Sequence, residues 1–219
     1  MLYVVAKGVL TPLLRLGFRV HTEGVDGVPA DGPVILASNH VSFCDSIFIP
    51  LVVPRQLTFL AKAEYFDQPV TGVVLRSLGI IPIKREGGNA SQRALASAIE
   101  ILHDGGVLAI YPEGTRSPDG RLHKGHTGVA RLALQTGATV VPVWLRGTAE
   151  VQPIGSRWMR PGKPVDITMG EPLQWPGRAG DISDPVALRK VTDEIMTAIG
   201  ALGGQPPLDE YANRRKASA

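Results

Sequence analysis

Short apolar runs alternate with helical patterns along most of this chain, and this alternation limits the possible fold more than any other feature. Runs typical of strands occur at residues 18–22, 34–37, 57–61, 80–84, 107–111, 139–145 and 165–169. Helical patterns lie between them at residues 46–52, 69–77, 90–103 and 128–135, and a last one covers residues 185–202. The run Val107-Leu108-Ala109-Ile110 is apolar on both faces, as in parallel strands that helices cover on either side. The pattern predicts an α/β domain with a mostly parallel or mixed twisted sheet flanked by helices.

The length of 219 residues and the apolar content of 44% suit a single domain with one full core. We expect an amphipathic N-terminal helical segment over residues 1–20, the α/β domain over residues 21–202, and a mobile tail over residues 203–219. The sequence therefore predicts one folded unit with a distinct segment at each end.

The N-terminal segment is apolar apart from four residues that recur every four positions, namely Lys7, Thr11, Arg15 and Arg19. On a helix, this spacing forms a cationic stripe. The segment then either lies in the plane of a membrane interface with the stripe toward anionic headgroups, or covers the domain's own core with the stripe in solvent. In either case Pro12 indicates a break or kink. No stretch reaches the ~18–20 apolar residues that a spanning helix needs, so we expect peripheral or monotopic attachment, on the cytoplasmic face of the cell membrane.

Charge and cysteine content narrow the possible partners. The net charge of +3, from 23 Lys and Arg against 20 Asp and Glu, fits anionic partners such as membrane lipid or phosphorylated substrates. Nucleic acid is not expected, because the basic residues are scattered and only 5% of the residues are aromatic. The single cysteine, Cys44, cannot form an internal disulfide and fits a reducing compartment. Its side chain is either a thiol nucleophile or a small buried filler, and the pattern favours the filler.

The stretch Asn39-His40-Val41-Ser42-Phe43-Cys44-Asp45 directly follows a predicted buried strand. Sites in open α/β domains usually form where strands end. A spacing of five residues would not aim both His40 and Asp45 at one spot from a regular helix, whereas a turn entering a helix would bring them together. Asp45 would then accept a hydrogen bond from one imidazole nitrogen and leave the other free as a base. The sequence therefore predicts His40 as a general base.

Two later strand ends supply cations that suit a phosphate. Lys84 and Arg85 follow one apolar run, and Arg116 follows another. Because carboxyl ends of parallel strands gather at one edge of the sheet, we expect these side chains to meet near His40 as a phosphate clamp. Each cation alone also fits an ordinary surface charge.

The same region contains Glu113 and Gly114. Glu113 is expected to hold a substrate hydroxyl, or else to pair with Arg116 or a lysine. Gly114 would let a ligand approach the backbone closely, or else serve a turn that needs a positive φ.

Two other patterns are rejected as sites. Residues 120–127 have the glycine spacing of a phosphate loop, but His126 stands where the lysine must be. His123 and His126 look like a metal pair, yet no Cys or acidic residue with ligand spacing accompanies them. We therefore expect no metal site, and histidines that face solvent or phosphate.

Taken in order, these stretches resemble the glycerolipid acyltransferase family, specifically the 1-acylglycerol-3-phosphate acyltransferases, over roughly residues 30–150. Asn39-His40 with Asp45 matches the family's His-x4-Asp box. Glu113-Gly114-Thr115-Arg116 matches its Pro-Glu-Gly-Thr-Arg box, and Tyr111 stands where that motif often begins with Phe. Arg85 falls on the arginine of the second motif and Pro142 on the proline of the fourth.

The resemblance implies acyl transfer from acyl-CoA or acyl carrier protein to the free hydroxyl of a lysophospholipid, with no further cofactor. His40 would take the hydroxyl proton, and Asp45 would orient the imidazole. The remaining motif residues would bind substrate: Arg85 and Arg116, with Lys84, at the phosphate, Glu113, Gly114 and Thr115 at the glycerol portion, and Pro142 in the acyl-chain or donor region.

Three rival functions remain open. The acceptor is another lysophospholipid or a glycolipid, or the same His-Asp pair activates water in a thioesterase, or the chain is a lipid-binding module without turnover. The phosphate clamp distinguishes the thioesterase, because simple hydrolysis has no use for it.

Overall fold

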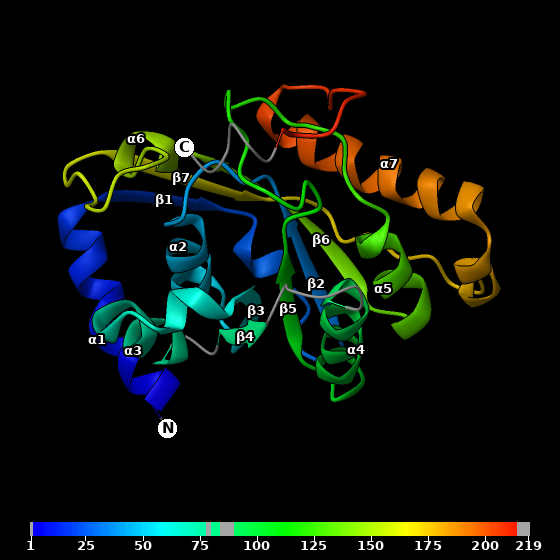
Figure 1. The fold of residues 1–219 in the computed structure, drawn as a ribbon, viewed down its shortest axis with the longest axis horizontal. Coiled ribbons are helices and arrows are strands. Elements are labelled where there is room, and N and C mark those ends of the chain that lie inside the picture. Colours follow the sequence, from blue (N-terminus) through cyan, green and yellow to red (C-terminus); the bar gives the residue numbers. More distant parts are fainter. Residues whose placement is uncertain (1, 78–79, 84–89, 214–219) are drawn as a thin grey trace.

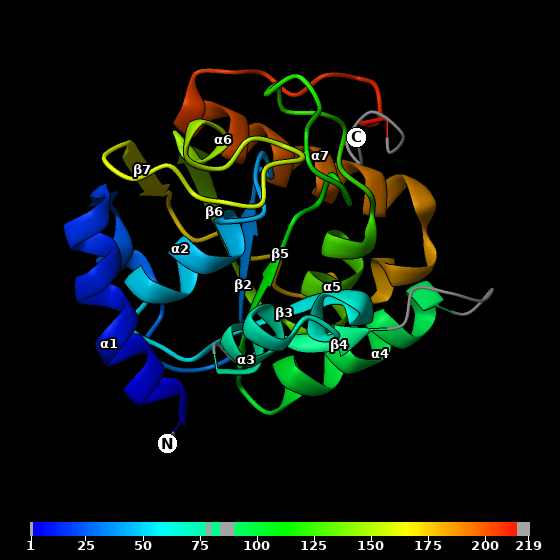
Figure 2. The same cartoon turned by 60° about the vertical axis from the view of Figure 1, so that its left-hand side comes forward.

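The computed structural model describes residues 2–77, 80–83 and 90–213. In this part of the chain, one mixed sheet is covered by helices on both faces, as Figures 1 and 2 show. The predicted α/β architecture with a mostly parallel sheet is therefore confirmed.

The sheet has the strand order β1-β7-β6-β2-β5-β3-β4 among the described residues. The strands are β1 (Arg19–Glu23), β2 (Val34–Ser38), β3 (Leu57–Lys62), β4 (Ile81–Ile83), β5 (Val107–Ile110), β6 (Thr139–Arg146) and β7 (Pro164–Met169). All neighbouring pairs are parallel except β6 and β7, which are antiparallel. Each predicted strand lies within about one residue of an observed one, as hydrophobic patterning allows for short buried strands.

The helices are α1 (Leu2–Gly17), α2 (Asp45–Val52), α3 (Pro69–Ser77), α4 (Ala90–His103), α5 (Gly128–Thr136), α6 (Thr148–Val151) and α7 (Pro185–Gly203). The sequence predicted all of these except α6, whose four residues are too few to form a periodic pattern. Helix α7 begins at a cap that the sequence supplies, since Asp184 accepts a hydrogen bond from the Val186 N–H and proline follows it.

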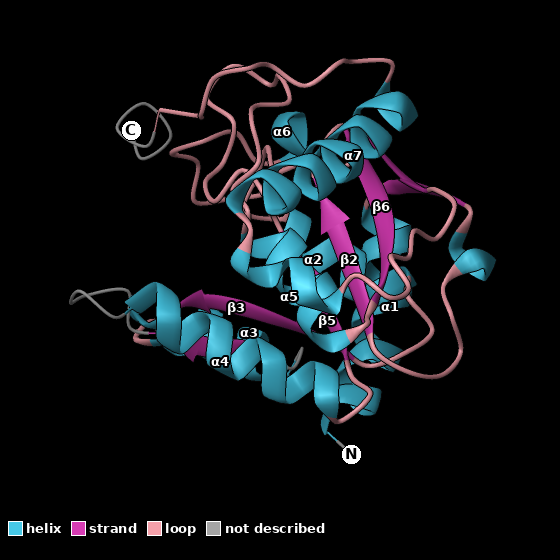
Figure 3. Cartoon of the chain, turned by 90° about the vertical axis from the view of Figure 1, so that its right-hand side faces the viewer, coloured by secondary structure: helices cyan, strands magenta, loops and turns pink. Residues whose placement is uncertain are grey.

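The central strand β2 separates two hydrophobic cores. Val34 and Leu36 pack into the core beneath α1, α2 and α3, whereas Ile35 and Ala37 pack into the core beneath α4, α5 and α7. Figure 3 shows this second set of helices on the side facing the viewer. Since these four side chains are fully buried, β2 is held on both faces and presents the residues that follow it at a fixed position.

The orientation of helix α1 differs from both predictions made for its cationic stripe. Its packing face is formed by Tyr3, Leu10 and Leu14, with Phe18 just after the helix, and the i, i+4, i+7 spacing of that face also includes Lys7 and Thr11. The Lys7 Nζ therefore donates to the Val53 carbonyl, and burial lowers the pKa of Lys7. The expected stripe in headgroups or solvent is thus wrong for Lys7 and Thr11, which turn toward the domain.

The outward face of α1 is apolar instead. Its exposed side chains are Val4 (70%), Val5 (61%), Val9 (54%), Leu13 (58%) and Leu16 (88%). The helix runs through Pro12 without ending, so the predicted break does not occur there, and the alternative of a kink stays a prediction. Within the described residues, no helix is long and apolar enough to cross a membrane.

The C-terminal tail contacts the domain in its described part. The Leu208 N–H donates to the Leu122 carbonyl (2.8 Å), and the Lys124 N–H donates to the Glu210 carbonyl (2.9 Å). Tyr211 stacks on His126 with ring centroids 4.6 Å apart. Residues 205–213 thus lie along the loop before α5, and the mobility of the tail stays a prediction.

Candidate active site

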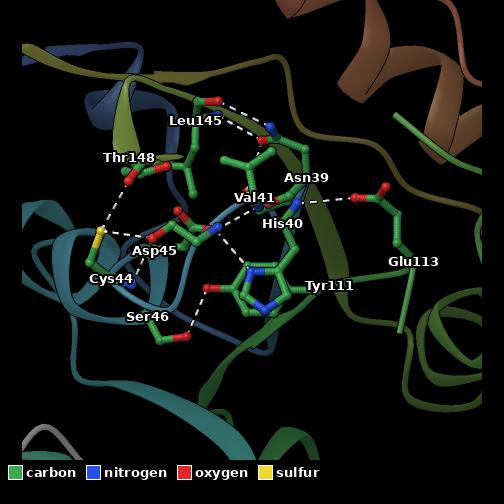
Figure 4. A network of polar contacts seen from close by, with 12 residues as sticks. Asn39, His40, Val41, Cys44, Asp45, Ser46, Tyr111, Glu113, Leu145 and Thr148 are labelled. Atoms are coloured by element: carbon green, nitrogen blue, oxygen red, sulfur yellow. Dashed lines mark hydrogen bonds and ion pairs between the residues drawn. The ribbon is translucent and has the colours of Figure 1, made fainter. Parts of the chain in front are cut away.

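The residue after β2 fixes the turn that leads to His40. Asn39 is buried, its Nδ2 donates to the Leu145 carbonyl (3.0 Å), and its Oδ1 accepts from the Leu145 N–H (2.7 Å), as Figure 4 shows. This paired contact ties the end of β2 to the end of β6. Because both polar atoms of a buried amide are satisfied, the backbone before His40 has one defined path.

His40 and Asp45 are in direct contact. The His40 Nδ1 lies 2.8 Å from Asp45 Oδ2, and the same oxygen accepts hydrogen bonds from the N–H groups of Val41 (2.9 Å) and Ser42 (2.8 Å). Asp45 is the first residue of α2 and is fully buried, whereas the His40 side chain is 16% exposed. The turn entering a helix thus brings the two side chains together in the predicted contact. With Nδ1 donating to the carboxylate, His40 Nε2 is left as a proton acceptor.

Tyr111 holds the other side of the imidazole. Its ring stacks on His40 with centroids 3.8 Å apart and planes 9° from parallel, and its hydroxyl lies 2.9 Å from Ser46 Oγ. Burial raises the pKa of Tyr111 well above its ordinary value. The sequence did not single out this role, although a signal was present: Tyr111 follows β5, the strand that pairs with β2.

We expect Tyr111→Phe to keep most activity and Tyr111→Ala to lose at least about tenfold in kcat, because only alanine removes the stacked ring that limits the orientation of His40. Measurement of kcat and KM separates this effect from substrate binding, since a positioning role lowers kcat while KM stays close to that of the wild type. Equal losses in the two variants would show instead that the hydroxyl contact with Ser46 matters more than the ring.

The buried Glu113 side chain links the turn after β2 to the loop that contains His123. Its side chain is 1% exposed, Oε2 accepts from the His40 N–H (3.0 Å), and Oε1 accepts from the His123 N–H (2.9 Å). The predicted pairing with Arg116 or a lysine stays a prediction, and a glycerol hydroxyl would have to reach an almost fully buried carboxylate. In this geometry the carboxylate positions the His40 backbone.

Burial raises the pKa of Glu113 to about 7, against the lowering effect of its two backbone hydrogen bonds. The folded protein therefore keeps this proton up to about pH 7, whereas the unfolded chain loses it near the ordinary value of 4.5. Stability must accordingly fall as the pH rises through this interval, by at most ~3 kcal/mol from this group. Glu113→Gln is expected to remove that dependence, measured as urea unfolding free energies at the two ends of the interval. Parallel pH curves for the two proteins would contradict this assignment.

A hydrogen bond to the His40 carbonyl brings the turn that contains Arg116 near the site. The Ser117 N–H donates to the His40 carbonyl (2.6 Å), so both peptide groups of His40 are bonded to the turn of residues 113–117. Arg116 lies within this turn and is half-buried, as is Thr115. Gly114 has φ +70°, a conformation that disfavours other residues, so its turn role is observed.

The other predicted residues are placed as follows. Lys84 and Arg85 lie outside the described residues. Pro142 lies in the middle of β6, opposite Ala37 of β2, and is buried. Cys44 is fully buried and burial raises its thiol pKa to about 12, which confirms the filler and excludes a thiolate nucleophile.

The two histidines of the rejected metal pair are also placed. His123 is buried, with Nε2 3.0 Å from Asp119 Oδ1. The expected exposure of this histidine to solvent is therefore wrong. His126 is exposed and stacks on Tyr211.

Comparisons with known proteins agree on one family. The sequence profile of the Acyltransferase family matches residues 19–146. A chloroplastic 1-acyl-sn-glycerol-3-phosphate acyltransferase of Arabidopsis thaliana is 31% identical over 179 residues, which cover 81% of this chain and 49% of that protein. A lyso-ornithine lipid O-acyltransferase of Rhizobium meliloti is 27% identical over 206 residues, covering 94% of this chain and 67% of that protein.

A solved structure supports the same assignment. The crystal structure of the 1-acyl-sn-glycerophosphate acyltransferase of Thermotoga maritima superposes with a TM-score of 0.68 at 29% identity, covering 91% of this chain and 77% of that one. The chain spans about half the length of the first curated relatives that it matches. Both boxes of the site lie within the profile match, and the chain belongs to the Acyltransferase family.

Proposed function

We propose that this protein transfers a fatty acyl group from acyl-CoA or acyl carrier protein to the free hydroxyl of 1-acylglycerol-3-phosphate, which yields phosphatidic acid. The observation that carries the proposal is the His40–Asp45 pair, hydrogen-bonded at 2.8 Å and tied through both His40 peptide groups to the turn that contains Arg116. A base next to a turn that carries a cation suits an acceptor with a hydroxyl and a phosphate. Two of the similar proteins, those of Arabidopsis thaliana and Thermotoga maritima, are named for the same acceptor.

In the proposed mechanism, His40 Nε2 takes the proton from the acceptor hydroxyl while the alkoxide oxygen attacks the thioester carbonyl carbon. The negative charge of Asp45 stabilises the imidazolium that forms. Collapse of the tetrahedral intermediate breaks the C–S bond, and the leaving thiolate takes the proton from His40. The protein forms no covalent intermediate, and no metal takes part in these steps.

The remaining residues would bind substrate. Arg116 would hold the acceptor phosphate, together with Lys84 and Arg85, and Thr115 and Gly114 would lie along the glycerol portion. Pro142 would contribute to the acyl-chain or donor region. Glu113 would act mainly by positioning His40, since both of its carboxylate oxygens are bonded to backbone.

We also propose peripheral attachment to the cytoplasmic face of the cell membrane through the outward face of α1. Five exposed aliphatic side chains on one helix, from Val4 to Leu16, form an apolar surface that water disfavours and a lipid interface accommodates. The reduced, buried thiol of Cys44 is compatible with that compartment.

The test of acyl transfer is Arg116→Ala, assayed by thiol release from acyl-CoA and by mass of the lipid product. We expect KM for 1-acylglycerol-3-phosphate to rise about 10- to 100-fold, because a charge-assisted bond to phosphate contributes roughly 1.5–3 kcal/mol. Arg121→Ala is the matched control, since Arg121 is an exposed arginine five positions away on the same loop. Thiol release that needs no acceptor and is unaffected by Arg116→Ala would replace transfer with hydrolysis.

A second acceptor class is favoured by one observation. The lyso-ornithine lipid acyltransferase aligns with 94% of this chain, and its named acceptor is not a lysophosphatidic acid. A panel of lysolipid acceptors with and without a phosphate separates the two proposals. Turnover that is fastest with a phosphate-free acceptor would support this second class.

A further inference from the structure

We infer that the loop of residues 152–163, together with the end of α1, is a binding surface for anionic phospholipid bilayers. This rests on the proposed function in one respect, because it specifies the membrane at which the acyltransferase would work. It adds a lipid class and a second anchor, centred on Trp158, to the apolar face of α1.

Trp158 is held in an exposed position. Its side chain is 81% exposed, while the adjacent Met159 is partly buried against the core beneath α1 and α2. The Ser156 Oγ donates to the Trp158 carbonyl (2.8 Å), and the Arg160 N–H donates to the Val151 carbonyl (2.8 Å). Because hydrogen bonds on both sides of Trp158 fix the turn, the indole lies outside the core as a consequence of the fold. Indole side chains favour the headgroup level of a bilayer, where the ring has apolar surroundings and its N–H has polar ones.

The loop adjoins the carboxyl end of α1. The Gly162 N–H donates to the Gly17 carbonyl (2.7 Å), and the Arg19 N–H donates to the Lys163 carbonyl (3.2 Å). Figure 1 shows the loop, in yellow between α6 and β7, beside the upper end of α1, in blue. The two most exposed large apolar side chains of the described residues, Leu16 and Trp158, therefore belong to two segments that are bonded to each other.

The two segments that carry these side chains also contain cations and no acidic residue. Residues 2–22 and 152–163 contain no Asp or Glu. The exposed basic residues of these segments are Arg15, Arg19, Arg157, Arg160 and Lys163. These two segments thus carry five exposed cations, in a chain whose net charge is only +3. An apolar centre with a basic rim is complementary to anionic headgroups, and each cation near such a surface contributes about 1 kcal/mol to binding.

The same loop begins at the active site. The Ser42 Oγ donates to the Gln152 carbonyl (2.7 Å), and Ser42 is two residues from His40 and bonded to Asp45. Lipid bound at Trp158 would therefore contact the loop whose first residue, Gln152, is bonded to Ser42 next to the His40–Asp45 pair. This arrangement places the bilayer surface next to the site that uses lipid substrate.

The experiment is co-sedimentation of the full chain with vesicles of phosphatidylcholine, with and without phosphatidylglycerol. Trp158→Ala is expected to lower the partition coefficient about tenfold on both compositions, since it removes apolar burial. Arg157→Gln/Arg160→Gln is expected to lower it about 25-fold on phosphatidylglycerol vesicles alone, and less as salt increases. Val186→Ser and Arg93→Gln/Lys190→Gln are the matched controls on α7 and α4, and both should bind as the wild type does.

A second measurement locates the tryptophan directly. Brominated phosphatidylcholine should quench the fluorescence of the wild type, and Trp158→Phe, which keeps an aromatic ring and vesicle binding, should lose most of that quenching. Vesicle binding is measured without acyl donor or acceptor, so it stands apart from whether the protein transfers acyl groups.

Three results would overturn the inference. Loop variants that sediment like the wild type, or no more weakly than the control variants, would show that the surface does not bind lipid. Unchanged quenching in Trp158→Phe would show that the indole does not reach the bilayer. Normal vesicle binding combined with weaker binding of acyl carrier protein would assign the surface to an acidic protein partner.

Discussion

Replacing His40 with alanine is expected to lower kcat/KM for acyl transfer by about 10³- to 10⁴-fold, because it removes the group that accepts the hydroxyl proton. The fold should survive, since the side chain is 16% exposed at the surface and the backbone bonds to Glu113 and Ser117 do not need the imidazole. Binding of 1-acylglycerol-3-phosphate should remain, measured by equilibrium binding alongside initial rates.

The matched control is His21→Ala, which removes an exposed histidine from β1 at the edge of the sheet and should leave kcat/KM unchanged. Vesicle binding of His40→Ala should also equal that of the wild type. An active His40→Ala variant would refute the assignment of His40 as the base, whereas an inactive variant with lost acceptor binding would indicate a binding role instead.

Asp45→Asn is expected to lower kcat by about 10²- to 10⁴-fold with a nearly unchanged fold. Asp45 Oδ2 accepts three N–H groups, whereas Oδ1 has no partner among the described residues. The asparagine can therefore keep its oxygen at the three donors and place its NH₂ at the Oδ1 position. What it loses is the negative charge that stabilises the imidazolium.

Unfolding free energies separate this charge effect from a loss of structure, because Asp45→Asn should lower kcat while its stability stays close to that of the wild type. Asp45→Ala, which leaves three buried donors unpaired, should instead lose several kcal/mol of unfolding free energy. A fall in stability of Asp45→Asn as large as that of Asp45→Ala would show that the asparagine oxygen does not replace the carboxylate.

Much of the fold could be predicted from the chain alone because its strands are short, apolar and bounded by polar turns. Val34–Ser38 and Val107–Ile110 read as buried on both faces, and both lie in the middle of the sheet. The antiparallel placement of β7 could not be predicted, since pairing direction depends on contacts between segments distant in sequence. Helix α6 was missed for a different reason, because one turn has no measurable periodicity.

The orientation of α1 shows how packing overrides a regular charge pattern. Lys7, Thr11, Arg15 and Arg19 form a regular stripe in sequence, yet the packing face centred on Tyr3, Leu10 and Leu14 takes in Lys7 and Thr11. A long lysine side chain tolerates this position because its stem packs and its ammonium reaches the Val53 carbonyl. Which face of an amphipathic helix turns inward is decided by the surface that it meets.

By itself, the sequence determined the α/β class, the order of the elements and the nearness of His40 to Asp45, because each depends on local patterning or on a spacing of a few residues. Only the tertiary structure decided what surrounds the imidazole. Tyr111 and Glu113 reach His40 from the segment after β5, 71 and 73 positions along the chain, and Trp158 adjoins α1 through backbone bonds at Gly17 and Arg19. Such contacts depend on strand order and register. The burial of the whole sheet sets both, and no single stretch of the sequence determines them.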